Sequence, residues 1–152
     1  MTRPPSIVAF ERLYLGSTLI FAIGAVLAWA AIRLVATTML AGQGHAGAVG
    51  LMLGVSIGVY ILWIAASVLF WWLVARQRSL VGKWLVVVTE AIGALLAVRA
   101  IVGLARTSTG PTIGGVLGLL STALAIAAAT YLFRPDAKAW LGETPADLGP
   151  RV

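Results

Sequence analysis

The run IGGVLGLLSTALAIAAATYLF, Ile113–Phe133, contains no charged residue. Three further apolar stretches lie at about Leu13–Leu40, Val49–Ala75 and Trp84–Ala105. A helix needs about 20 apolar residues to cross the hydrocarbon core of a bilayer, and only helices or closed barrels satisfy every backbone polar group there. The stretches lack the alternation of polar and apolar residues that barrel strands require. The sequence therefore predicts an all-α integral membrane protein, an antiparallel bundle of four transmembrane helices.

The composition of the 152-residue chain is that of a membrane protein. Apolar residues make up 61% of it and charged residues 11%, whereas a soluble domain carries about 25% charged residues. A soluble globule and a disordered chain, which is polar and charge-rich, are both excluded. The absence of cysteine and the single histidine exclude disulfides, thiolate metal sites and bis-histidine haem ligation.

The sequence contains no motif for nucleophilic or metal-dependent catalysis. We therefore expect a protein that is not an enzyme, with no cofactor and no metal site. His45 lies in the uncharged loop Ala41–Ala48 and is expected to be a solvated loop residue.

The basic residues lie between the apolar stretches, so the net charge of +6 does not indicate nucleic-acid binding. Eight of the eleven Lys and Arg residues fall on the side of the membrane that holds both termini: Arg3, Arg12, Arg76, Arg78, Lys83, Arg134, Lys138 and Arg151. The other three are Arg33, Arg99 and Arg106. Because cytoplasmic loops carry the excess of basic residues, we expect both termini in the cytoplasm.

Aromatic residues gather at the same predicted interface. They are Phe10, Tyr14, Phe70, Trp71, Trp72, Trp84, Tyr131, Phe133 and Trp140. Amphipathic rings anchor helices at the level of the lipid headgroups. We expect Trp71, Trp72, Trp84 and Trp140 to be such interfacial anchors.

The first apolar stretch has an alternative interpretation as a signal peptide. Arg3 and Arg12 make a basic leader, and Ala28-Trp29-Ala30 has small residues around a possible cleavage site. The apolar run starts late and continues past that site to Met39, which favours a membrane-spanning helix.

Small residues recur at four-residue spacing along the apolar stretches. They are Gly50, Gly54 and Gly58 in the second stretch, Gly110, Gly114 and Gly118 near and in the fourth, and more loosely Gly16, Gly24 and Ala28 in the first. Such stripes let helix backbones approach closely in a membrane. The sequence favours a tight bundle with the second and fourth helices near its centre, and the alternative is homo-oligomerisation through one glycine face.

Glu90 is the most informative polar residue inside an apolar stretch. A charged group near the centre of a transmembrane helix costs about 2.5–3.5 kcal/mol, which makes it a candidate functional group. Glu90 could carry a proton or hold a cationic substrate. The structural alternatives are a salt bridge with Arg12 at the start of the first helix and a hydrogen bond to a neighbouring Ser or Thr, and the sequence favours a structural role.

Three arginines fall at the opposite side of the membrane. Arg99 and Arg106 are seven residues apart and share a helix face, and Arg33 lies at the same level on the first helix. Together they could bind an anion or a lipid phosphate. The favoured alternative is that each side chain extends to its own lipid headgroup.

The segment Tyr131–Leu141 ends the fourth helix and restarts at Pro135 as a short helix. We expect Trp140 and Leu141 to face the membrane and Lys138 to face lipid phosphates. With the four-span layout, this ending resembles small four-helix inner-membrane proteins of bacteria whose function is unassigned, which implies an inner-membrane location. The expected organisation is a transmembrane domain at 1–141 and a mobile cytoplasmic tail at 142–152.

Two functions fit these features. The favoured one is a non-catalytic accessory or scaffold subunit that packs against itself or a larger membrane complex. The alternative is a small homo-oligomeric transporter or channel in which Glu90 is the membrane carboxylate. In helix count and in its single dominant carboxylate the chain resembles the small multidrug transporters, but the carboxylate lies on the third helix and not the first.

Overall fold

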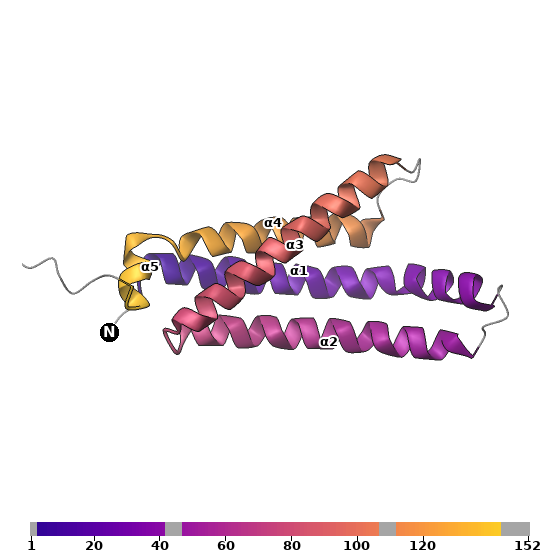
Figure 1. Ribbon diagram of the computed structural model, residues 1–152, viewed down its shortest axis with the longest axis horizontal. Helices are drawn as coiled ribbons and strands as arrows, with labels where there is room; N and C mark the ends of the chain where they lie inside the picture. The colour runs from indigo at the N-terminus through magenta and orange to yellow at the C-terminus, as the bar shows by residue number, and fades with distance from the viewer. Residues whose placement is uncertain (1–2, 42–46, 107–111, 144–152) are drawn as a thin grey trace, which may run out of the picture.

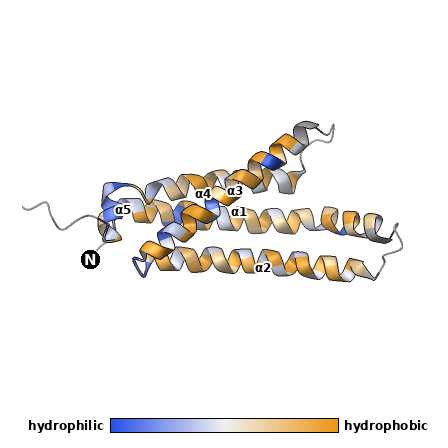
Figure 2. Ribbon diagram, viewed as in Figure 1, coloured by the Kyte–Doolittle hydropathy of each residue, from blue (hydrophilic) through white to orange (hydrophobic). Residues whose placement is uncertain are grey.

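The computed structural model describes residues 3–41, 47–106 and 112–143. Within these ranges the chain forms helices α1 (Pro5–Ala36), α2 (Ala48–Ala75), α3 (Leu80–Arg106), α4 (Ile113–Tyr131) and α5 (Pro135–Trp140). A π-helical segment, η1 (Thr37–Ala41), extends α1 (Figure 1). The four long helices are each long and apolar enough to cross a membrane, and Figure 2 shows apolar residues along all of them. The predicted all-α membrane bundle is confirmed.

Two of the long helices begin before the apolar stretches that predict them. α1 begins at Pro5 and α3 at Leu80, so Glu11, Arg12 and Lys83 are helical residues. Proline suits the first turn of a helix because that turn has no partner for its N–H groups. We call the end of the bundle that holds Pro5, the α2–α3 turn and α5 the terminal end, and the opposite end the distal end.

The four long helices form a ring in which α1 contacts α2 and α4, and α3 contacts α2 and α4. The most extensive contact joins α1 and α4, which lie side by side. α3 crosses the other helices diagonally, so its distal half diverges from the bundle (Figure 1). The side chains of Leu95, Val98 and Ile101 on that half are exposed.

Small residues allow α1 and α4 to approach closely. A Cβ atom added at Gly114 would lie 2.6 Å from the Cβ of Ala28 and 3.1 Å from the carbonyl oxygen of Gly24. A Cβ added at Gly24 would lie 3.1 Å from the Cβ of Leu117. These distances are shorter than carbon atoms normally approach, so only glycine fits at Gly114 without displacement of its neighbours.

The prediction that α2 lies near the centre is wrong. A Cβ added at Gly50, Gly54 or Gly58 would meet no atom within 4 Å, so this glycine face of α2 is open. The closest helix packing joins α1 to α4, because Gly24 and Ala28 match Gly114 in register. Gly118 also has open space over its Cα, and Gly110 lies outside the described residues.

The buried core lies at the terminal end of the bundle. Its members come from every helix: Ile7, Phe10, Tyr14, Val74, Ala75, Val86, Ala125, Ala128, Ala129, Leu132, Ala137 and Leu141. Phe10 and Tyr14, expected among the interfacial aromatics, are therefore core residues, and their rings stack with centroids 5.2 Å apart. They turn inward because α1 is enclosed there by α4 and α5.

Helix α5 packs across the terminal end of the bundle, against the start of α1. Its Asp136 accepts hydrogen bonds from the backbone N–H of Ser6 (3.1 Å) and from the Ser6 hydroxyl (2.7 Å). The first turn of α1 has no side-chain cap of its own, so Asp136 supplies it from a distant part of the chain. Leu141, expected to face the membrane, is only 4% exposed and packs in the core.

The residues after α5 are also held in place. Gly142 adopts a φ of 75°, a left-handed conformation that glycine adopts without strain after a helix. The chain then turns so that Glu143 pairs with Lys83 of α3, with 2.7 Å between Nζ and the carboxylate. The first two residues of the predicted tail, Gly142 and Glu143, thus contact α5 and α3, and 144–152 lie outside the described residues.

Substitution of Gly114 tests the α1–α4 contact. We expect Gly114→Ala to lower the free energy of unfolding by about 1–3 kcal/mol, because the added methyl group overlaps Ala28. Thermal unfolding in detergent measures the change. Gly118→Ala is the matched control one turn away, and it should be neutral or stabilising because alanine is the better helix former. Equal effects of the two changes would contradict a contact specific to Gly114.

Asp136 gives the terminal end a pH dependence. The hydrogen bond from the Ser6 hydroxyl, and then that from its backbone N–H, lower the pKa of Asp136. A carboxyl with a lowered folded pKa stabilises the fold above its unfolded value, near 4, and loses that contribution as pH falls through the folded value.

We therefore expect Asp136→Ala to lower the unfolding temperature at pH 7, with a difference from wild type that shrinks below about pH 4. Thermal scans between pH 7 and pH 3 measure it. Lys138→Gln, on the exposed side of the same helix, is the control. A difference that stays constant with pH would show that Asp136 does not act through its charge.

Candidate functional site

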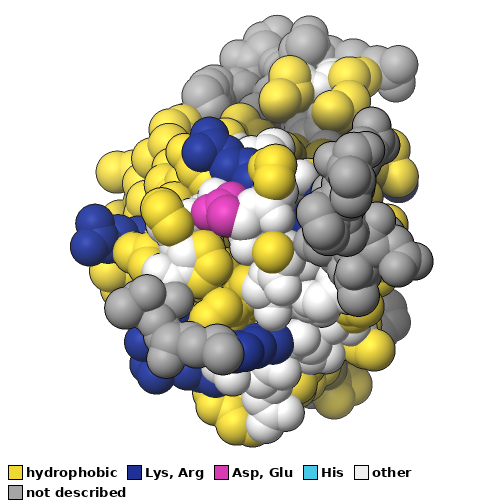
Figure 3. All heavy atoms as spheres, turned by 90° about the vertical axis from the view of Figure 1, so that its left-hand side faces the viewer, with side chains coloured by type: hydrophobic (Ala, Val, Ile, Leu, Met, Phe, Trp, Pro, Cys, Tyr) yellow, Lys and Arg dark blue, Asp and Glu magenta, His cyan; other side chains and the backbone are white. Residues whose placement is uncertain are grey.

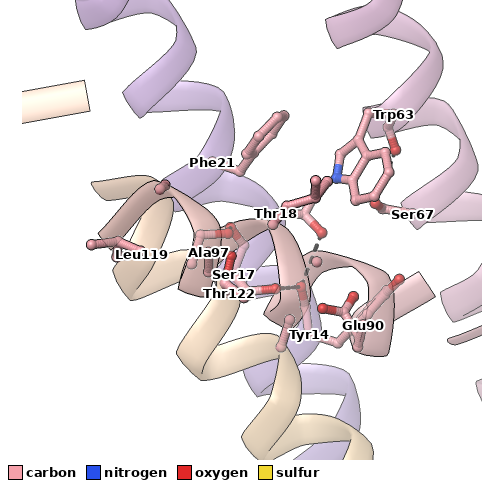
Figure 4. Close-up of a pocket in the computed structure, with 15 residues that line it drawn as sticks. Tyr14, Ser17, Thr18, Phe21, Trp63, Ser67, Glu90, Ala97, Leu119 and Thr122 are labelled. Atoms are coloured by element: carbon pink, nitrogen blue, oxygen red, sulfur yellow. Dashed lines mark hydrogen bonds between the residues drawn. The ribbon is translucent and has the colours of Figure 1, made fainter. Parts of the chain in front are cut away.

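Seven polar side chains of the membrane-spanning helices line one pocket, of about 270 Å³, between the four long helices (Figure 4). α1 contributes Tyr14, Ser17, Thr18 and Phe21, α2 contributes Trp63 and Ser67, α3 contributes Glu90, and α4 contributes Ser121 and Thr122. The pocket exists because α3 crosses the α1–α4 pair diagonally. Its volume lies near the lower limit of ligand pockets, which span about 300–1,000 Å³.

The Ser and Thr hydroxyl groups of the pocket donate their protons to backbone carbonyls. Ser17 and Thr18 both donate to the carbonyl of Tyr14, at 2.7 and 3.0 Å. Ser67 donates to Trp63, Thr122 to Gly118, and Ser121 across the helix interface to Ser17. A carbonyl only accepts hydrogen bonds, so each of these hydroxyls has only oxygen lone pairs left to offer the pocket.

Glu90 brings the one charge of the pocket. Its carboxylate interacts electrostatically with the phenol of Tyr14, which also lies near the hydroxyl of Ser67. Figure 4 shows the Tyr14 and Glu90 side chains next to each other. Gly93, one turn further along α3, leaves the space between Glu90 and Thr122 open: a Cβ there would lie 3.8 Å from Glu90 Oε2 and 3.9 Å from Thr122 Cγ2.

The expected salt bridge between Glu90 and Arg12 is not formed. The ion pairs among residues 3–41, 47–106 and 112–143 are Arg3–Glu11 and Lys83–Glu143, and Arg12 is exposed. Nor does a hydroxyl in that part of the chain donate to Glu90, because the nearby Ser and Thr hydroxyls bond to carbonyls. Both structural explanations of Glu90 therefore fail, since α3 turns it toward the pocket and not toward the start of α1.

A second cavity, of about 230 Å³, also reaches Glu90. It lies between α3 and α4 and is lined otherwise by Val87, Ala91, Ala94, Ile126, Ala129, Thr130 and Phe133. Glu90 thus stands between a polar pocket inside the bundle and a largely apolar cavity at the α3–α4 face.

The distal arginines are not brought together into a site. Arg33 lines a shallow recess with Ala30, Leu34 and Thr37, all from the α1–η1 segment. Arg99 is exposed on the diverging half of α3. The side chain of Arg106 and all of His45 and Arg151 lie outside the described part of the chain. Headgroup contacts by separate arginines remain the interpretation that this arrangement favours.

The tryptophans expected as anchors divide into two pairs. Trp72 and Trp84 are 43% and 54% exposed, as side chains that contact lipid must be. Trp71 and Trp140 pack against the core, and the guanidinium of Arg78 lies 3.9 Å from the ring centroid of Trp140. Trp140 turns inward because α5 folds back under the bundle.

The sequence analysis missed the residues that surround Glu90. The spacing of Tyr14, Ser17, Thr18 and Phe21 places them on one face of a helix, and this spacing is the signal that could have revealed the pocket. For Ser67, Ser121 and Thr122 no such pattern distinguishes the pocket from any other face.

Comparison with protein-family models, curated proteins and solved structures finds no match to this chain. The function therefore has to be argued from the site itself.

Proposed function

We propose that the protein is a small transporter or channel of the bacterial inner membrane, with Glu90 as its coupling or selectivity carboxylate. The observation that carries this proposal is a single carboxylate in a pocket lined by all four membrane-spanning helices, with no basic partner among the described residues. An unpaired carboxylate inside a membrane is costly, and such residues mark ion or substrate pathways. A cation that enters the pocket would be the partner of the Glu90 carboxylate.

The electrostatics of the pocket support a cation. Five Ser and Thr residues present oxygen lone pairs to it, and the carboxylate adds a negative charge. Oxygen acceptors around a carboxylate stabilise a positive charge and disfavour an anion. The net charge of +6 does not oppose this, because the exposed basic side chains Arg76, Arg78, Arg134 and Lys138 lie at the terminal end, away from the pocket.

The same basic residues support an orientation. Figure 3 shows Lys and Arg side chains grouped at the terminal end of the molecule. The excess of basic residues on the cytoplasmic side of membrane proteins favours a cytoplasmic location for this end. Both termini then face the cytoplasm, and the α1–α2 connection faces the other side.

The open face of α2 favours a second function, an accessory or scaffold subunit. Gly50, Gly54 and Gly58 lie on one face of α2. The space above this face is open, because no other helix of the described chain packs against these glycines. Glycine stripes of this kind let the helix of a second molecule approach closely. A second copy or a larger membrane complex could occupy this face, and a homo-oligomer is compatible with transport.

Native mass spectrometry of the protein extracted from its host membrane separates these two functions. A homo-oligomer without other subunits is the result expected of a transporter. Reproducible recovery with a set of other membrane proteins would instead favour the accessory subunit. Gly54→Leu, which fills the open face of α2, should reduce whichever assembly is found, and Gly16→Leu, a glycine of α1 that also has open space, is the control.

Charge displacement in proteoliposomes tests the transporter. We expect a concentration jump of at least one of three salts, potassium, methylammonium and guanidinium chloride, to give a current with the wild type and none with Glu90→Gln. The unfolding temperature of the Glu90→Gln variant should not fall below that of the wild type, because Glu90 has no ion-pair partner in the described chain. Gly93→Leu fills the space beside Glu90 without removing its charge and should also abolish the current.

Glu11→Gln is the control, because Glu11 pairs with Arg3 at the terminal end, outside the pocket. A wild-type protein that gives no current with any of the three cations would contradict the proposal. So would an undiminished current in Glu90→Gln.

A further inference from the structure

The pocket around Glu90 has two tiers of different chemistry. The polar tier, nearer the terminal end, consists of Tyr14, Ser17, Thr18, Ser67, Glu90, Ser121 and Thr122. The apolar tier, further toward the distal end, consists of Phe21, Trp63, Leu96, Ala97, Ala100 and Leu119. Figure 4 shows Phe21 and Trp63 on the far side of Thr18 from Tyr14 and Glu90, and the two rings are 6.4 Å apart. A molecule that fills both tiers needs a polar and an apolar part.

The polar tier offers more hydrogen-bond acceptors than donors and therefore favours a partner that donates. All five Ser and Thr hydroxyls of the tier donate their protons to carbonyls, Glu90 only accepts when ionised, and the Tyr14 phenol is the donor that the tier retains. A cationic head with several N–H groups can donate to these oxygens and neutralise the carboxylate at once. A quaternary ammonium group supplies the charge but no donor, so it leaves the acceptors unpaired.

The pocket does not have the form of a metal-ion site. Calcium takes six to eight oxygen ligands at about 2.3–2.6 Å, commonly from several carboxylates. The described residues contain no group of three His, Cys, Asp or Glu side chains that could hold a metal. A cavity of about 270 Å³ with aromatic and alanine walls also leaves much more space than a bare ion fills.

We propose that the pocket selects a small organic cation with an N–H-bearing head, a primary ammonium or a guanidinium, and a compact apolar body. The head lies against Glu90 and the hydroxyl oxygens of the polar tier, and the body lies against the Phe21 and Trp63 rings. This assignment rests on the proposed cation-binding function and names its substrate class.

A pair of probes whose heads carry either N–H groups or N-methyl groups tests this selection. Benzylammonium and benzyltrimethylammonium carry the same ring and charge, and only the first can donate hydrogen bonds. Isothermal titration of the protein in nanodiscs, with empty nanodiscs subtracted, measures both affinities. We expect benzylammonium to bind about tenfold more tightly or better, as hydrogen bonds to a charged group would give.

Variants on α2 and α3 attribute the difference to the polar tier. Ser67→Ala removes one acceptor and should weaken benzylammonium binding several-fold while leaving benzyltrimethylammonium unchanged. Ser56→Ala is the matched control, because the Ser56 hydroxyl also donates to the carbonyl four residues earlier, that of Met52, but lies outside the pocket. Glu90→Gln should weaken the binding of both cations.

Each contrary result has a distinct meaning. Equal affinity for the two probes, or an effect of Ser56→Ala as large as that of Ser67→Ala, overturns the selection for N–H donors. Failure of benzylammonium to bind overturns the assigned substrate class, and the proposed transporter still stands if a Glu90-dependent current is observed. If the wild-type protein shows neither benzylammonium binding nor a Glu90-dependent current, the proposed transporter is refuted as well.

Discussion

The close approach of α1 and α4 at Gly24, Ala28 and Gly114 is the contact on which the rest of the structure depends. In a membrane, contact between apolar helices brings no hydrophobic free energy, because lipid tails are as apolar as the side chains. Association therefore requires backbones close enough for extensive van der Waals contact. Among the described helices, α1 and α4 are in contact over more of their length than any other pair. α2 and α3 pack on the pair less extensively, and the diagonal course of α3 follows from that freedom.

The terminal end adds polar constraints to this apolar contact. α5 follows α4 directly, and the α1–α4 pairing therefore places Asp136 beside the uncapped first turn of α1. Lys83, only 1% exposed, then meets Glu143, and its ammonium also lies 4.4 Å from the ring centroid of Phe133. A lysine so deeply buried is tolerated because it is paired, which contrasts with Glu90.

The pocket is a consequence of the same geometry. Polar groups at membrane depth must find partners within the protein, and the Ser and Thr hydroxyls do so on nearby carbonyls. These hydroxyl groups line the space that α3 leaves beside α1 and α4, where their oxygen atoms can still accept hydrogen bonds. Glu90 reaches this space without a basic partner in the described chain, which is why a cation from outside is the natural complement.

The sequence by itself determined that the chain is a bundle of four membrane-spanning helices, because the length and hydropathy of a helix in lipid are local properties. It also identified Glu90, since a carboxylate in an apolar run is costly in any arrangement. Only the tertiary structure decided that Gly114 and not Gly54 packs within the chain, because both have the same spacing and only register and crossing angle distinguish them. The same holds for the surroundings of Glu90: Tyr14, Ser67 and Thr122 lie on three other helices, and the direction of α3 alone determines that Glu90 faces them and not Arg12.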